Sequence, residues 1–275
     1  SQAAVVMPVE YNNLRFIVVG AGGTGSFVVP TLARLIFELE QQQNKSAEML
    51  IVDPDKVESN NIPRSNFCFA EVGRYKAQTL AERVATAWGI EAGFSCEKFD
   101  AEQHLKRANS DYRSLTIIVG CVDNYRARRE MHRALDEFRS YGESSRLWWI
   151  DGGNGKTSGQ VLLGSTTKAL KPEQYFTGTS ICGTLPAPSL QHPDLLKPEK
   201  IETESVASCP NRIRLGEQSL NINQRVAVEM AEMLAEMFLT RSLKRCASYF
   251  DFESGTSRSV YCTQEGIQRV VGPKK

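Results

Sequence analysis

The chain has 275 residues, 41% of them hydrophobic, which is enough to bury a core without disulfides or a structural metal. Its 33 Lys and Arg residues balance 32 Asp and Glu residues, and a net charge of +1 argues against nucleic acid or anionic lipid as a partner. The start of the chain, SQAAVVMPVEYNN, has no basic stretch before an apolar one, and no apolar run approaches about 18 residues. We therefore expect a cytoplasmic protein without membrane contact.

The first half of the chain alternates strands with helices. A short apolar run ends at glycine, the following helix has apolar residues at helical spacing, and the alternation then repeats. The predicted strands are 15–19, 49–53, 93–99 and 115–123, and the predicted helices are 26–40, 75–88 and 124–138. Apolar strands that alternate with amphipathic helices predict a Rossmann-like α/β fold, with a mostly parallel sheet covered by helices on both faces.

The second half has a different composition. Strands are expected at 147–153 and 160–165, a helix at 217–241, and two antiparallel C-terminal strands at 248–254 and 257–263, joined as a hairpin around Gly255. Between them, 166–214 is rich in proline and lacks sustained periodicity, which favours a long crossover loop on the substrate side. We predict a single domain over 1–275, with a nucleotide-binding core at 14–165, this crossover loop, and a C-terminal helix and hairpin at 215–275.

Four glycines follow the first strand. Gly20, Gly22 and Gly25 match the pattern G-x-G-x-x-G, and Gly23 doubles the middle glycine. Glycine allows a tight turn there and lets backbone N–H groups approach a phosphate at the helix N-terminus. Gly25 is followed by Ser26 and not by the Lys of a P-loop, which argues against a P-loop NTPase. The alternative is an ordinary turn between strand and helix.

Charged residues further along narrow the choice of nucleotide. Asp53 ends the second strand, where a carboxylate can accept hydrogen bonds from the ribose of either NAD or ATP. Asn61, Arg64 and Lys76 follow, and an Arg with a Lys suits the several charges of a polyphosphate. Taken singly, the Asn could instead cap a turn, and the two cations could be solvated surface charges.

Asp123 ends the fourth predicted strand of the core, at the edge where ligands of open α/β sheets bind. A carboxylate there would repel phosphate unless Mg²⁺ lay between them, so we predict that it binds the metal. The alternative is that Asp123 is the N-cap of the helix that starts at Asn124.

In this order, the motifs GAGGTGS, DPDKVESNNIPR, VGRYK and VDNYRAR resemble those of the ThiF/MoeB/HesA family of adenylating enzymes, relatives of the ubiquitin-activating enzymes. The resemblance covers roughly 14–165, resumes near Cys209, and within the family points to the plasmid-associated branch called the PRTRC system ThiF proteins.

The resemblance implies an adenylyltransferase that uses ATP and Mg²⁺. It would adenylate the C-terminal glycine of a small ubiquitin-like protein, release pyrophosphate, and act as a homodimer. By similarity, the site residues fall into three groups: Gly20, Gly22, Gly23, Gly25, Asn61, Arg64 and Lys76 would contact the phosphates, Asp53 the ribose, and Asp123 the magnesium. A carboxylate nucleophile is already anionic, so such a site needs positioning and charge neutralisation but no general base.

The chain departs from the family in two ways, and one cysteine leaves its role open. Its seven cysteines form no C-x-x-C pair, and Cys182, Cys209, Cys246 and Cys262 lack metal spacing, so we predict no structural zinc. The segment before the first strand lacks the R-Y-x-R-Q-like motif whose arginine reaches the ATP of the partner subunit in many relatives. Cys209 lies where some relatives carry the sulfur that accepts the activated carboxylate, so it either forms a thioester or is structural.

Three other functions fit part of the pattern. The glycine loop and Asp53 also suit an NAD(P)-dependent oxidoreductase. The missing N-terminal motif would suit a nucleotide-binding scaffold without catalysis. A relative that modifies tRNA would use the arginines of the helix at 124–138, although the near-neutral charge argues against nucleic acid.

Overall fold

The computed structural model describes residues 2–43, 45–106, 113–137, 145–198 and 219–271. An eight-stranded sheet runs through it in the order β11-β10-β7-β6-β5-β2-β3-β4. The strands from β4 to β6 are parallel, and β7, β10 and β11 continue the sheet in antiparallel fashion. Their bounds are β2 (Asn13–Val19), β3 (Ser46–Val52), β4 (Gly93–Ser95), β5 (Ser114–Gly120), β6 (Leu147–Asn154), β7 (Ser158–Gly164), β10 (Arg245–Asp251) and β11 (Thr256–Tyr261).

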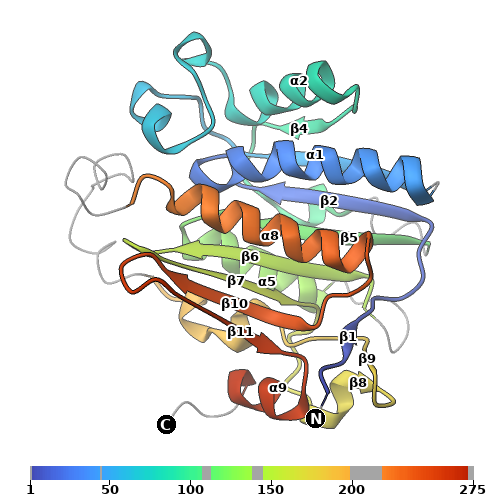
Figure 1. The fold of residues 1–275 in the computed structure, drawn as a ribbon. Helices are drawn as coiled ribbons and strands as arrows, with labels where there is room; N and C mark the ends of the chain where they lie inside the picture. Colours follow the sequence, from blue (N-terminus) through green and yellow to red (C-terminus); the bar gives the residue numbers. More distant parts are fainter. Residues whose placement is uncertain (1, 44, 107–112, 138–144, 199–218, 272–275) are drawn as a thin grey trace.

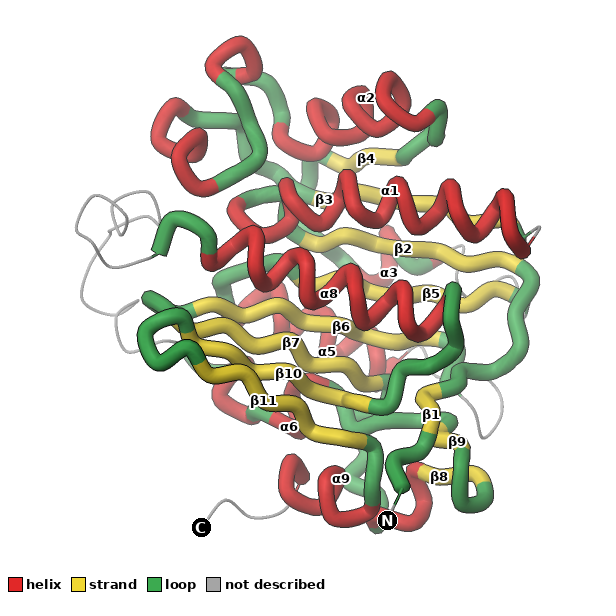
Figure 2. Tube along the Cα trace, in the orientation of Figure 1, coloured by secondary structure: helices red, strands yellow, loops and turns green. Residues whose placement is uncertain are grey.

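Helices cover both faces of this sheet. Figures 1 and 2 show α1 and α8 lying across the near face, with α5 and α6 behind it, and α2 packs beside α1. Successive side chains of a strand point to opposite faces, so Phe16 and Val18 join one buried cluster while Ile17 and Val19 join the other. The helices are α1 (Gly23–Gln43), α2 (Lys76–Trp88), α3 (Ala101–His104), α5 (Tyr125–Glu137), α6 (Pro188–Gln191) and α8 (Ile222–Phe238). The predicted fold class is confirmed.

Several short elements were not predicted. β1 (Val5–Val6), β9 (Ile181–Cys182) and β8 (Phe176–Thr177) form a second, three-stranded sheet. Parts of the expected crossover loop therefore have regular structure, and η3 (Pro172–Tyr175) and η4 (Pro193–Leu196) add 3-10 turns to it. A helix, α9 (Gln264–Val271), follows the C-terminal hairpin. Apart from α9, these elements have two to four residues and are too short to show a period in the sequence.

The strand order places a binding site at one edge of the sheet. From β2 the chain adds β3 and then β4 on one side, and then crosses to the other side to add β5 and β6. The point between β2 and β5, where the direction of strand addition reverses, opens a crevice at the carboxyl ends of the strands. None of the helices in the described part of the chain is long and apolar enough to span a membrane.

Candidate active site

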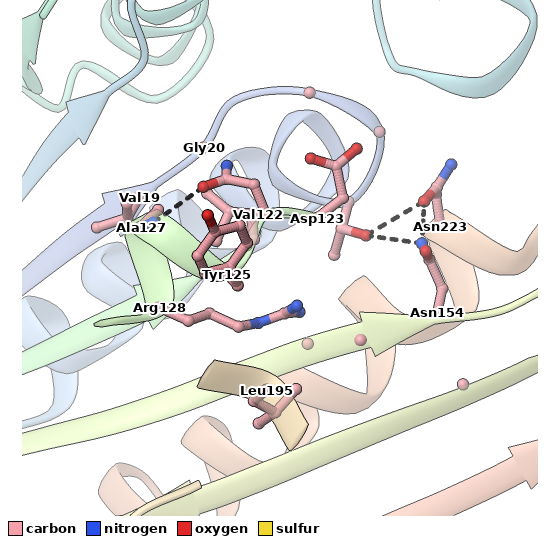
Figure 3. A pocket seen from close by; sticks show the side chains of 18 of the residues that line it. Val19, Gly20, Val122, Asp123, Tyr125, Ala127, Arg128, Asn154, Leu195 and Asn223 are labelled. Carbon is pink, nitrogen blue, oxygen red and sulfur yellow. Dashed lines mark hydrogen bonds between the residues drawn. The ribbon is translucent and has the colours of Figure 1, made fainter. Parts of the chain in front are cut away.

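A cavity of about 1610 Å³ opens at this edge of the sheet. Figure 3 shows the part of it around the ends of β2, β5 and β6. Nearly all the residues predicted from the sequence line it, although they come from five separate segments of the chain. They are Gly20, Gly22, Gly23, Asp53, Asn61, Arg64, Lys76 and Asp123.

The glycines of the first turn are needed for different reasons. Gly20 has φ +92°, and a Cβ on it would lie 2.7 Å from the backbone oxygen of Cys121. A Cβ on Gly22 would meet nothing within 4 Å, so here the backbone itself borders the cavity. Gly25 does not line the cavity: a Cβ there would lie 1.9 Å from the Gly20 oxygen, so it lets α1 pack closely on the end of β2.

Asn223 joins the glycine turn to two other segments, and sequence reasoning missed it. This residue of α8 is 2% exposed, and its Oδ1 accepts hydrogen bonds from Thr24 Oγ1 and Asn154 Nδ2 (Figure 3). Its Nδ2 donates to the Arg64 backbone oxygen at 3.2 Å. A Cβ on Gly23 would lie 2.6 Å from that same nitrogen, so the doubled glycine gives α8 room to approach α1.

Asp53 is held by the backbone on both sides. Its Oδ2 accepts from the Ala21 N–H at 2.6 Å, and its Oδ1 accepts from the Asp55 N–H at 2.8 Å. Burial raises the pKa of Asp53, while the Lys76 charge and these backbone hydrogen bonds partly lower it again. The carboxylate thus fixes the glycine turn beside the end of β3, and each oxygen keeps a lone pair for a ligand hydroxyl.

The two predicted cations are not solvated surface charges. Lys76 starts α2, is 8% exposed, and its Nζ lies 3.1 Å from the Asp55 Oδ2. Arg64 ends η1 (Ser59–Arg64), and its buried Nε has no hydrogen-bond partner among the described residues. A buried guanidinium nitrogen without a partner is costly, and an anion in the adjacent cavity would satisfy it.

Asn61 has a structural role. Its Oδ1 accepts from the N–H of Glu58, the N-cap of η1, at 2.9 Å, so the alternative that it caps a turn is confirmed. Because Asn61 also lines the cavity, this turn places both its own amide and Arg64 at the cavity wall.

Asp123 is not the N-cap of α5. The Asn124 Oδ1 accepts the Ala127 N–H at 2.9 Å, so Asn124 caps the helix that begins at Tyr125. The exposed Asp123 lies at the cavity (Figure 3), on the turn after β5. Among the described residues, no group of three or more His, Cys, Asp and Glu is arranged to hold a metal ion.

A buried ion pair at the cavity was missed in the sequence. Arg128 of α5 is 8% exposed, and its Nε donates to both carboxylate oxygens of Asp151, at 3.1 and 3.3 Å. Asp151 lies in β6 and is fully buried, which raises its pKa, and the Arg128 charge partly lowers it again. A single acid in an apolar strand such as LWWIDGG has no spacing that predicts a partner 23 residues away.

Four cysteines of the chain were candidates for a functional role. Cys182, Cys246 and Cys262 are buried, and none of them lines the cavity. Cys209, the candidate for thioester formation, lies outside the described residues.

The sequence pattern of the ThiF family matches residues 9–190, about two thirds of the chain, and the protein belongs to this family. No curated protein sequence matches the chain.

Solved structures share the fold at low sequence identity. PaaA has a TM-score of 0.59 and 12% identity, over 90% of this chain and 64% of its own. E. coli MccB with AMPCPP and MccA has a TM-score of 0.57 and 14% identity, over 90% of this chain and 63% of its own. E. coli MccB with ATP has a TM-score of 0.56 and 13% identity, over the same shares of the two chains. The chain thus spans a little under two thirds of the length of these proteins.

Proposed function

We propose that the protein binds ATP with Mg²⁺ and adenylates the C-terminal carboxylate of a small ubiquitin-like protein. One observation carries the proposal: Arg64, Lys76 and Asp123, from three separate segments, line one cavity together with the open backbone of Gly22. Membership of the ThiF family and the fold shared with MccB, which was solved with ATP, support the same interpretation.

Residues that line the cavity suit both the phosphates and the ribose of a nucleotide. The unpartnered Nε of Arg64 and the ammonium of Lys76 would bind the phosphates, and the bare backbone at Gly22 leaves room for them to approach. Asp53 would accept hydrogen bonds from the ribose. When polyphosphate binds, we expect Lys76 to exchange part of its contact with Asp55 for the phosphate oxygens.

A magnesium ion in such a site needs few ligands from the protein. Mg²⁺ is commonly held by one or two carboxylates together with substrate phosphates and water, so Asp123 alone suffices as a ligand here. When bound, the ion supplies neutralisation of phosphate charge.

The reaction that these residues support is a displacement at phosphorus. An oxygen of the substrate carboxylate attacks the α-phosphorus, the bond from that phosphorus to the bridging oxygen breaks, and pyrophosphate leaves. Arg64 and Lys76 would stabilise the charge on the departing phosphates, and the glycine turn would hold the α-phosphate in line with the nucleophile. Transfer of the activated acyl group to Cys209, and a homodimeric assembly, are further parts of the proposal.

ATP–pyrophosphate exchange in the presence of a small Gly-terminated partner tests the function. We expect partner-dependent exchange with the wild type and a loss of about 100-fold or more in Lys76→Ala, because one positioned charge is removed from the site. Lys168→Ala is the matched control, since Lys168 is exposed and does not line the cavity.

Tight binding of ATP without exchange on any such partner would rule out the activity and leave the scaffold interpretation. A larger thermal stabilisation by NAD(H) than by ATP with Mg²⁺ would instead favour an oxidoreductase.

A further inference from the structure

The Arg128–Asp151 pair at the cavity has a geometry that stability alone does not explain. Only the Nε edge of Arg128 contacts Asp151, through two hydrogen bonds of 3.1 and 3.3 Å. A pair built for stability would use the bidentate fork, in which two guanidinium nitrogens each donate to one carboxylate oxygen. A buried pair is in any case rarely better than apolar packing of the same volume.

The other edge of the guanidinium faces the cavity. Arg128 lines the cavity, and its side chain extends from α5 between Tyr125 and Leu195 (Figure 3). Asp151 is the only described residue that accepts a hydrogen bond from it. The two Nη groups are therefore available to a ligand, while the fully buried Asp151 fixes the plane of the guanidinium.

The cavity has cations on two flanks. Arg64 and Lys76 reach it from η1 and α2, which follow β3, whereas Arg128 reaches it from α5, which follows β5. Its volume of about 1610 Å³ is also more than one nucleotide needs, because small-molecule sites typically measure about 300–1,000 Å³. The second flank thus offers a planar donor pair to a second anionic ligand.

We propose that Arg128, held in place by Asp151, binds the substrate carboxylate that is to be adenylated. This inference rests on the proposed function and names the residue that binds the carboxylate nucleophile of that reaction. A guanidinium matches the planar carboxylate with two parallel hydrogen bonds, which orients the group for attack. Its charge also offsets the repulsion that Asp123, on the turn after β5, would exert on an incoming carboxylate.

The test compares a synthetic decapeptide that ends in Gly-Gly as the free acid with the same peptide as the C-terminal amide. With AMPCPP present, the wild type should bind the acid about 10- to 100-fold more tightly, the range expected for hydrogen bonds between charged groups. Arg128→Gln should abolish this preference and leave the affinity for AMPCPP within about twofold of the wild type.

Arg128→Gln alone leaves Asp151 buried without its partner, so the double variant Arg128→Gln/Asp151→Asn removes both charges and keeps the side-chain volumes. It should also bind acid and amide equally. Arg133→Gln is the matched control: this arginine is on the same helix, pairs with Glu130 and Glu137, and does not line the cavity, so its variant should keep the preference for the acid.

Equal binding of acid and amide by the wild type, no binding of the acid, or a preference that survives in the double variant would overturn the assignment. A lower affinity for AMPCPP with an unchanged preference for the acid would also overturn it and place Arg128 on the α-phosphate. Partner-dependent pyrophosphate exchange, measured in parallel, separates the two failures, because its absence from the wild type contradicts the proposed function itself.

Discussion

Two constraints favour glycine at position 20: its positive φ and the close approach of the Cys121 oxygen. Mutation can separate their effects on stability. Gly73 has nearly the same φ, +89°, but a Cβ there would meet nothing within 4 Å. Gly73→Ala should therefore lower the free energy of unfolding by about 1–2 kcal/mol, the cost of a left-handed residue. Gly20→Ala should cost about 1–3 kcal/mol more, because its Cβ would also collide with the Cys121 oxygen.

Urea denaturation of both variants measures this difference. Equal losses of stability would show that the contact with Cys121 is relieved at no cost and that the turn is not sterically restricted.

Asp53 makes the stability of the protein depend on pH. Burial raises the pKa of Asp53 in the folded chain above the ordinary value of 3.8, which applies to the unfolded chain. At a pH between the unfolded pKa and the folded pKa, the folded state therefore binds more protons than the unfolded state. The free energy of unfolding therefore falls as pH rises through this window. Asp53→Asn removes the titration, so the stability of the wild type relative to this variant should decline as pH rises from below 3.8 toward neutral.

Urea denaturation of the two proteins across a pH series checks the prediction. A difference that instead grew with pH would mean that the hydrogen bonds from Ala21 and Asp55 outweigh the effect of burial on the carboxylate.

Residues that belong to spaced motifs could be predicted, whereas residues recognised only through a distant partner could not. The glycine pattern, Arg64 and Lys76 follow one another in the order of the family motifs they resemble, and the structure places all three features at one cavity. Asp151 is a single acid in an apolar strand, and Asn223 is one of several polar residues at the start of α8. Their partners lie on other elements, so only the folded chain shows what they contact.

At the scale of elements, α8 is tied to the site through one side chain. Asn223→Ala would leave Thr24 and Asn154 without a common acceptor and the Arg64 oxygen without a donor. We expect the free energy of unfolding to fall by about 1–3 kcal/mol, as when one partner of a buried hydrogen bond is removed. Affinity for ATP should also fall, because the connection that Asn223 makes between the start of α1 and η1 would be lost.

Gln224→Ala is the matched control, since this neighbour on α8 is exposed. Denaturation and nucleotide titration of both variants give the comparison. A loss of stability in Asn223→Ala with unchanged affinity for ATP would mean that α8 supports the fold but not the site.

Strands and helices could be predicted where they are long enough for their periodic pattern to be detected. Apart from the short β4 and α3, the strands and helices of the parallel half appear near their expected places, because buried strands and amphipathic helices of seven or more residues have clear patterns. β1, β8 and β9 have two residues each, and the pairing of β1 with β9 joins segments more than 150 residues apart. Such pairing is decided by tertiary packing and leaves no local signal.

At the scale of the whole molecule, the sheet places two groups of cationic side chains on opposite sides of one crevice. Arg64 and Lys76 follow the strand added on one side of β2, and Arg128 follows the strand added on the other side. This arrangement suits a reaction between two anions, a polyphosphate and a carboxylate, each neutralised by its own flank.

Transfer of oxygen from the substrate carboxylate to AMP tests this account most directly. The Gly-terminated partner is labelled with ¹⁸O in its C-terminal carboxylate, incubated with the enzyme, ATP and Mg²⁺, and the AMP released after hydrolysis of the acyl bond is analysed by mass spectrometry. If a carboxylate oxygen attacks the α-phosphorus, the AMP must carry one ¹⁸O. Unlabelled AMP, or ADP with inorganic phosphate as the products, would contradict the proposed adenylation.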